Sequence, residues 1–254
     1  MKNLLNLPEA PRASVGSTQD ELRLLAQAGA PEGTVVWAAE QTAGRGRGAH
    51  SWHSAPGLGL WVSLLLRPRV EVRRWPGLTP LFAVAASWAI ESVAPTGWRA
   101  AIKWPNDLFG SRGKLGGILA ETAAGGLIIG FGLDVAHEEN DFPVELRGTA
   151  SSLRLEGFAP LPTPAELADR LNQHLTVAYE RYQNGDRAFL ASELRSRFFL
   201  HRKQVRLLPT EGSEPLEGVA CDVGEQGELI LETPSGLQSV WAGEVIGWEA
   251  KETD

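Results

Sequence analysis

The feature that most constrains the fold is a change in hydrophobic pattern near residue 202. Before that point, segments with helical periodicity alternate with apolar runs typical of strands. Beyond it, about fifty residues carry only short β-type segments, separated by Gly, Pro and Glu. A chain of 254 residues can hold one or two domains. We therefore expect an α+β domain over residues 1–201 and a small β-barrel over residues 202–254.

Caps, turn residues and apolar periodicity place the individual elements. Residues 18–21 have the pattern of a capping box, and Thr163 with Glu166 predicts a second capped helix start. Gly125-Gly126 predicts a hairpin turn. The expected helices are 18–28, 81–93, 163–184 and 188–199. The expected strands are 34–39, 58–66, 100–103, 115–122, 127–135, 205–208, 219–223, 228–231 and 245–248.

Composition and charge argue against several classes of function. The net charge of −7 is unlike that of a dedicated nucleic-acid-binding protein, which is usually basic. Cys221 is the single cysteine, which excludes an intramolecular disulfide and a cysteine-based zinc cluster. No segment resembles a signal peptide, and no stretch of about 20 apolar residues could span a bilayer. We expect a cytoplasmic protein without DNA or membrane partners.

A Gly/Arg run over residues 41–52 (QTAGRGRGAHSW) follows the strand expected at 34–39. Glycine lets backbone N–H groups approach a ligand closely, and arginine offers a planar fork of donors to carboxylate or phosphate. The run can therefore hold a small anion. RG-rich segments also bind nucleic acid, so the run alone does not decide between the two.

A second polar cluster follows the strand expected at 100–103. Residues 103–107 (KWPND) form a strand end and turn, a usual location for ligand contacts. Asp107 is equally well explained as a turn residue. Lys114 lies beside Gly113, Gly116 and Gly117, which favours close approach of a ligand over a solvated surface position.

Four segments, Ser17-Thr18, 41–47, 103–107 and 114–121, resemble the biotin protein ligase family in their order and spacing. The resemblance implies a two-step reaction. Biotin and Mg-ATP give biotinyl-5′-AMP and pyrophosphate, and the biotinyl group then passes to a lysine of a biotin carboxyl carrier domain of acetyl-CoA carboxylase or a related carboxylase. It also implies a mixed β-sheet with helices similar to the class II aminoacyl-tRNA synthetase core, plus a C-terminal SH3-like barrel.

Some members of that family carry an N-terminal DNA-binding domain. No helix-turn-helix pattern precedes the first expected helix here. We expect a short form that acts as a ligase only.

The resemblance also implies roles for individual residues, with Lys114 and Arg47 as the catalytic pair. The implied biotin contacts are Ser17, Thr18, Gln19, Gln41, Arg45, Gly46, Arg47, Lys114 and Gly117. The implied contacts with ATP or the adenylate are Arg45, Arg47, Trp52, Lys103, Asn106, Lys114 and Asp134. No protein metal ligand is implied, because Mg²⁺ enters with ATP. Positive charge suits this reaction, since a carboxylate must approach a phosphate.

The roles implied for Ser17-Thr18 and for Trp52 have structural alternatives, and three features depart from the family pattern. Ser17 and Thr18 could serve as helix caps, and Trp52 could anchor its loop in the core. Gln19 and Asp134 stand where asparagine is usual, and Asp134 replaces a donor–acceptor amide by an anion. Residues 48–51 (GAHS) are less basic than the family pattern. The Gly/Arg run is expected to order over the adenylate and shield it from water, and this weaker charge predicts looser retention.

Two other functions fit parts of the sequence. A lipoate-attaching enzyme would share the fold and the acyl-adenylate chemistry, but the spaced motifs and the C-terminal barrel favour biotin. A non-catalytic RNA-binding module would use the Gly/Arg run, although the acidic net charge argues against it. An exposed strand edge could pair two copies into a homodimer.

Overall fold

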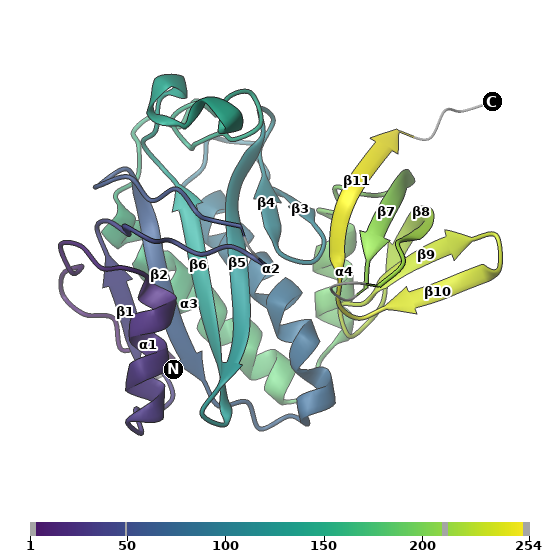
Figure 1. The fold of residues 1–254 in the computed structure, drawn as a ribbon, viewed down its shortest axis with the longest axis horizontal. Coiled ribbons are helices and arrows are strands. Elements are labelled where there is room, and N and C mark those ends of the chain that lie inside the picture. The colour runs from purple at the N-terminus through teal and green to yellow at the C-terminus, as the bar shows by residue number, and fades with distance from the viewer. Residues whose placement is uncertain (1–3, 49, 210–212, 251–254) are drawn as a thin grey trace.

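The structure, a computed structural model, describes residues 4–48, 50–209 and 213–250 as two antiparallel sheets with helices (Figure 1). The helices are α1 (Thr18–Gln27), α2 (Leu78–Glu91), α3 (Pro164–Gln183) and α4 (Ala188–Arg195), with short 3₁₀ helices η1 (Val72–Gly77), η2 (Glu139–Asp141) and η3 (Val144–Leu146). The first sheet holds β1 (Val35–Ala38), β2 (Gly59–Leu66), β3 (Ala101–Lys103), β4 (Asp107–Phe109), β5 (Lys114–Ala123) and β6 (Gly126–Asp134). The second holds β7 (Lys203–Leu208), β8 (Leu216–Val223), β9 (Leu229–Thr233), β10 (Gly236–Val240) and β11 (Glu244–Ala250).

The larger sheet has the order β1-β2-β6-β5-β4-β3 and is covered by helices on both faces. Leu64 on β2 belongs to the core cluster that includes residues of α2 and α3, whereas its neighbour Leu65 packs with Leu22 of α1. Successive strand residues point to opposite faces, so β2 is buried along its whole length. Helix α1 covers only one end of its face, which leaves the rest of that face open to form a site.

The smaller sheet lies beside the β3–β4 edge of the larger one (Figure 1). Its order is β10-β9-β8-β7-β11. Strands β10 and β11 are thus the two edges, and the pairings found among the described residues do not close the sheet into a barrel. The expected strands at 205–208, 219–223, 228–231 and 245–248 are confirmed as β7, β8, β9 and β11, whereas β10 was not predicted.

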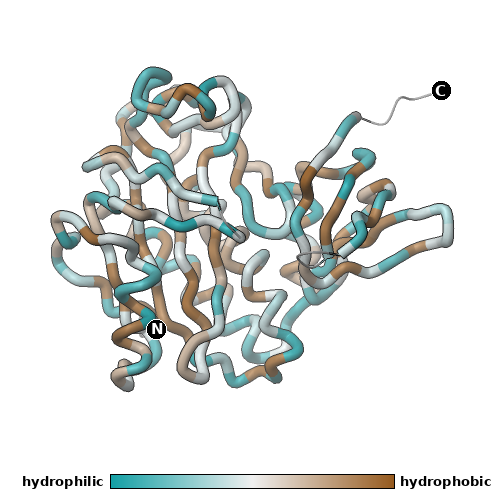
Figure 2. Tube along the Cα trace, in the orientation of Figure 1, coloured by the Kyte–Doolittle hydropathy of each residue, from teal (hydrophilic) through white to brown (hydrophobic). Residues whose placement is uncertain are grey.

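Hydrophobic segments concentrate along the strands of both sheets (Figure 2). Val205, Leu207 and Leu231 of the smaller sheet belong to the same buried cluster as Leu78 and Trp104 of the larger unit. The indole N–H of Trp104 donates to the carbonyl of Gly227, 2.8 Å away and buried. One continuous core therefore crosses the boundary that the sequence pattern placed near residue 202.

Most expected elements are present, with shifted ends. The capped start of α3 is confirmed, because the Glu166 N–H donates to the Thr163 hydroxyl over 3.2 Å. The capping box at 18–21 is wrong: Ser17 is the N-cap residue of α1 and makes no capping bond. The β5–β6 turn is one residue earlier than expected, at Ala124-Gly125, which both have positive φ.

Other boundaries also differ. Strand β4 was expected to be turn only, α2 begins three residues early at Leu78, and α4 ends at Arg195. Within the part of the chain that is described, no helix combines the length and the apolarity needed to cross a membrane.

Candidate functional site

A cavity of about 680 Å³ opens on the face of the larger sheet that α1 leaves uncovered. Its floor is made by glycines of β5 and β6. A Cβ at Gly132 would lie 2.6 Å from the Trp52 indole, and one at Gly117 would lie 3.2 Å from the same ring. Larger residues at these positions would push the Trp52 ring away from the sheet, so the glycines allow that ring to pack closely. The volume lies in the range of small-molecule sites.

Every residue that the sequence implicated lines this cavity. They are Ser17, Thr18, Gln19, Gln41, Arg45, Gly46, Arg47, Trp52, Lys103, Asn106, Lys114, Gly117 and Asp134. Segments up to 117 residues apart along the chain thus meet at one place, as the resemblance implied. The contacts with biotin and nucleotide assigned to each residue stay predictions.

One end of the cavity is a network of neutral polar side chains. The Gln41 carbonyl oxygen accepts from the N–H and the hydroxyl of Thr18, over 2.9 and 3.0 Å. The Ser63 hydroxyl lies 2.8 Å from that of Thr18 and donates to Gln19 over 3.0 Å. Thr18 and Ser63 have one hydroxyl proton each, but their hydroxyls make three contacts with oxygen atoms. The network therefore has fewer donors than acceptors, and its oxygens can accept a hydrogen bond from a ligand N–H.

Ser17 belongs to the same end of the cavity and is 3% exposed. Its hydroxyl is buried and has no partner among the described residues, which is costly unless a ligand supplies one. Thr18 is likewise engaged with Gln41 and Ser63 rather than with the helix backbone. The capping alternative for this pair is therefore wrong, because tertiary contacts take up the Thr18 side chain.

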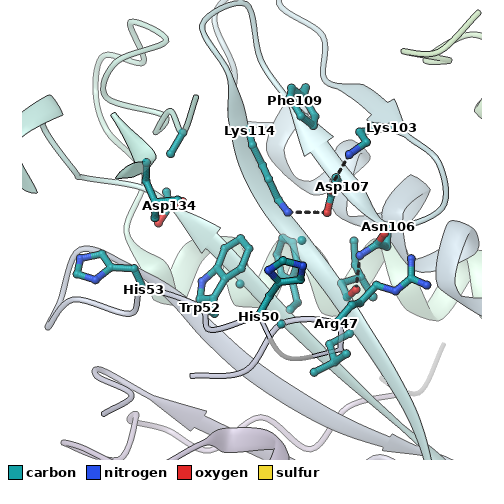
Figure 3. Close-up of a pocket in the computed structure, with 18 of the residues that line it drawn as sticks. Arg47, His50, Trp52, His53, Lys103, Asn106, Asp107, Phe109, Lys114 and Asp134 are labelled. Atoms are coloured by element: carbon teal, nitrogen blue, oxygen red, sulfur yellow. Dashed lines mark hydrogen bonds and ion pairs between the residues drawn. The ribbon is translucent and has the colours of Figure 1, made fainter. Parts of the chain in front are cut away.

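The other end carries charge, gathered around Asp107 (Figure 3). The Lys114 ammonium lies 2.7 Å from one carboxylate oxygen of Asp107, and the Lys103 ammonium lies 3.7 Å from the other. The Asp107 side chain is 12% exposed, so water screens these ion pairs only in part. Burial lowers the pKa of Lys103, although Asp107 opposes that shift. Asp107 thus holds two cations at the floor of the cavity.

Trp52 and Asn106 shape the walls of this charged end. The Lys114 ammonium lies 5.3 Å from the centre of the Trp52 ring, within cation–π range. The Trp52 indole N–H is buried and has no partner among the described residues. The Asn106 side-chain amide donates to the carbonyl of Ile118 over 2.9 Å. Trp52 therefore packs on the glycine floor, with its N–H directed at Gly132.

The two arginines of the Gly/Arg run contact protein groups in this structure. Arg45 forms 2.6 Å ion pairs with Asp20 and Glu121. Arg47 donates to the carbonyl of Gly243, in the loop before β11, over 2.7 Å. The run is thus docked on both α1 and the smaller sheet. In the less basic segment 48–51, Ala49 lies outside the described residues.

Asp134 closes the cavity beside two histidines, the buried His137 and the half-buried His53. It is 6% exposed, and burial raises its pKa well above the ordinary carboxyl value. His137, fully buried, lies 3.4 Å from it, and burial lowers the pKa of His137 to about 4. The His53 ring lies 5.9 Å from that of His137, tilted by 58°. Among the described residues, no three His, Cys, Asp or Glu side chains gather as metal ligands.

Comparisons with known proteins agree with this geometry. Residues 13–134 match the model of the biotin/lipoate A/B protein ligase family. The chain is 35% identical over 240 residues to the bifunctional ligase/repressor BirA of Bacillus spizizenii, covering 91% of this chain and 71% of that protein. It is 34% identical over 242 residues to the biotin–[acetyl-CoA-carboxylase] ligase of Mycobacterium tuberculosis, covering 92% and 86%. The chain belongs to the biotin protein ligase family.

A solved member of the biotin protein ligase family has the same fold throughout. The Aquifex aeolicus biotin protein ligase, in complex with biotin and ATP, superposes with a TM-score of 0.80 at 25% identity, covering 95% of this chain and 98% of that one. The similarity therefore includes the smaller sheet as well as the larger one.

Sequence reasoning missed several residues of this biotin protein ligase site. Asp107 had an equally good explanation as a turn residue, and only the structure brings the two lysines to it. Glu244 and Trp248 of β11 line the cavity, and the Lys103 ammonium lies 4.2 Å from the Trp248 ring. Ser63 lies in an apolar strand, where one hydroxyl among leucines was the available signal.

Proposed function

We propose that this chain is an ATP-dependent, AMP-forming biotin protein ligase. A carboxylate oxygen of biotin attacks the α-phosphorus of ATP, and pyrophosphate leaves, which gives biotinyl-5′-AMP. The amine of an acceptor lysine then attacks the acyl carbon, and AMP leaves. Both steps build negative charge on oxygen, which fixed cations and N–H donors stabilise.

The observation that carries the proposal is the Lys114 ammonium, held 2.7 Å from Asp107 at the floor of the cavity. One end of the cavity is a neutral polar network, and the other is the charged end to which Lys114 belongs. The first suits the ureido ring of biotin, which both donates and accepts hydrogen bonds. The second suits a carboxylate meeting a phosphate. Lys114 is thus positioned to contact both reacting anions.

The remaining site residues follow from the same arrangement. Ser17, Thr18, Gln19 and Gln41 bind the biotin head, with Gly46 and Gly117 allowing close approach. Arg45, Arg47, Trp52, Lys103, Asn106 and Asp134 surround the nucleotide. Mg²⁺ enters as a complex with the triphosphate.

The acceptor is a lysine of a biotin carboxyl carrier domain, as the name of the M. tuberculosis relative suggests. We further propose residues 1–201 as the catalytic domain, with a core similar to class II aminoacyl-tRNA synthetases. Residues 202–254 would be an SH3-like barrel. Register shifts between Ala220 and Asp222 and between Val245 and Gly247 bend the smaller sheet, which supports this classification.

Mass spectrometry of an isolated carrier domain tests the function directly. Incubation with the enzyme, biotin and Mg-ATP should add one biotinyl group, and lipoate in place of biotin should add nothing. Transfer of lipoate at a comparable rate would refute the biotin assignment.

Lys114→Ala tests the site. We expect adenylate formation to fall by roughly two to three powers of ten with the fold retained, a loss typical of removing one electrostatic contact to the transition state. Arg69→Ala, at an exposed position outside the cavity, is the matched control. Near-normal turnover of Lys114→Ala would refute the role of Lys114.

A further inference from the structure

The loop between β4 and β5, residues 110–113, is held by a single carboxylate. Glu156 accepts from the backbone N–H groups of Ser111 and Arg112 over 2.8 and 2.9 Å. It also accepts from the hydroxyls of Ser111 and Ser151, over 2.8 and 2.9 Å. Burial would raise the pKa of Glu156, but these donors hold it below the ordinary value. A four-residue loop at the surface is thereby fixed in one conformation.

The segment that carries Glu156 also fixes the start of β5. The Lys114 N–H donates to the carbonyl of Thr149 over 2.9 Å, and its carbonyl accepts from Ser151 over 2.7 Å. Gly113 allows this approach, because a Cβ there would lie 2.4 Å from the Thr149 oxygen. The loop therefore has a fixed position relative to Lys114, and both line the cavity.

Arg112 differs from the other lysines and arginines of the cavity wall. Lys103 and Lys114 share Asp107, Arg45 pairs with acids of its own, and Arg47 donates to a carbonyl. The backbone N–H of Arg112 donates to Glu156. Its guanidinium makes no hydrogen bond or ion pair within residues 4–48, 50–209 and 213–250. An exposed guanidinium on a fixed backbone is ready to bind an anion.

We propose that Arg112 binds the β- and γ-phosphates of the nucleotide and holds the pyrophosphate as it leaves, with Glu156 as the positioning residue that fixes the Arg112 backbone. The inference rests on the proposed ligase function. A biotin carboxylate oxygen bonds to the α-phosphorus. The bond from that phosphorus to the oxygen bridging to the β-phosphate breaks, and pyrophosphate leaves with its electron pair. Arg112 lies two residues before Lys114, and both line the cavity. With Lys114 at the α-phosphate, Arg112 is placed at the β- or γ-phosphate of the same nucleotide.

The chemistry of the leaving group favours arginine at this position. Charge moves onto the bridging oxygen and the β-phosphate as the bond breaks, and a planar fork of donors can contact two phosphate oxygens at once. The same contact assists the reverse reaction, in which pyrophosphate attacks biotinyl-5′-AMP. Arg112 should therefore affect ATP and pyrophosphate without affecting biotin.

Arg112→Gln tests the proposal in both half-reactions. We expect the KM for ATP, and the KM for pyrophosphate in the reverse direction, to rise roughly 10- to 100-fold, as for loss of one charge-assisted contact. The KM for biotin and the rate of transfer from synthetic biotinyl-5′-AMP to the carrier domain should stay unchanged. Arg112→Lys should restore part of the pyrophosphate affinity. Arg69→Gln, an exposed arginine outside the cavity, should change none of these values.

Glu156→Gln should raise the same two KM values, and adding it to Arg112→Gln should raise them little further, because both act through one contact. Thermal unfolding checks that this variant folds, and if it does not, Arg112→Gln decides alone. An unchanged KM for pyrophosphate in Arg112→Gln would overturn the proposal. So would a loss confined to transfer, which would assign Arg112 to the acceptor protein. A wild-type enzyme that forms no biotinyl-5′-AMP would instead refute the proposed function itself.

Discussion

Replacing Asp107 with asparagine tests how the two lysines of the site are held. The carboxylate lies 2.7 Å from the Lys114 ammonium and 3.7 Å from that of Lys103. Asparagine keeps the size and one oxygen acceptor but removes the charge. The two ammonium groups would then face each other without a shared anion. We expect Lys114 to lose its alignment toward the reacting carboxylate and phosphate.

The size of the effect follows from the distances and the burial. At an effective dielectric constant of about 20, each pair at these separations attracts by roughly 4–6 kcal/mol. The Lys114 side chain is 34% exposed, so water screens part of this attraction. Desolvation of the charges cancels more of it, which leaves about 2–3 kcal/mol. If this energy aligns Lys114 in the transition state, adenylation in the Asp107→Asn variant slows about 30- to 150-fold.

Single-turnover formation of biotinyl-5′-AMP from biotin and Mg-ATP measures this step, and transfer from synthetic biotinyl-5′-AMP serves as an internal comparison. Asp169→Asn, which removes an exposed carboxylate on α3, is the matched control and should behave as wild type. A rate for Asp107→Asn within about threefold of wild type would refute the alignment argument, since that is under 1 kcal/mol.

Three further variants test other contacts. In urea titrations, the free energy of unfolding of the wild type should fall by about 3 kcal/mol as pH falls from 6.5 to about 4, because the unfolded His137 imidazole takes up its proton first, and His137→Phe should remove this loss. Asp134→Asn should raise the melting temperature increasingly as pH rises above the ordinary carboxyl range, because burial raises the folded-state pKa of Asp134 and ionisation there destabilises the fold. Gly132→Ala should displace Trp52, at a cost of about 1–3 kcal/mol, and speed biotinyl-5′-AMP release in a filter assay.

Local patterns predicted the elements whose formation depends on neighbouring residues. The start of α3 was readable because Thr163, a proline and Glu166 lie within one helical turn. Strand β10 (Gly236–Val240) was missed because it is short, begins with glycine and holds two polar residues, Gln238 and Ser239, and its pairing with β9 decides its conformation. The capping box at residues 18–21 failed for a related reason, since Thr18 contacts side chains 23 and 45 residues away.

The functional site, like the fold, could be predicted from the sequence only in part. The motifs identified which residues meet at the cavity, but not which contacts hold them there. Asp107 looked like a turn residue because its partner Lys114 approaches only when β4 pairs with β5. Glu156 gave no signal at all, because the loop that it holds, with the Ser111 and Arg112 N–H donors, lies about 45 residues away. The role of a residue whose partners lie on distant strands can be recognised only once the fold is known.

The hydrogen bond from the Trp104 indole to the Gly227 carbonyl has a consequence for how this sequence can vary. It joins the motif at residues 103–107 to a turn 123 residues later in the smaller sheet. A Cβ at Gly77 would likewise lie 2.4 Å from the Gln226 carbonyl, so this turn is closely seated. Replacing Trp104 would leave the buried Gly227 carbonyl unpaired, and a Cβ at Gly227 would lie 2.7 Å from the Pro80 ring. Residues in these two segments should therefore be inherited as matched sets, and grafting the smaller sheet of a relative should succeed only when its β8–β9 turn comes with that relative's own 103–107 segment.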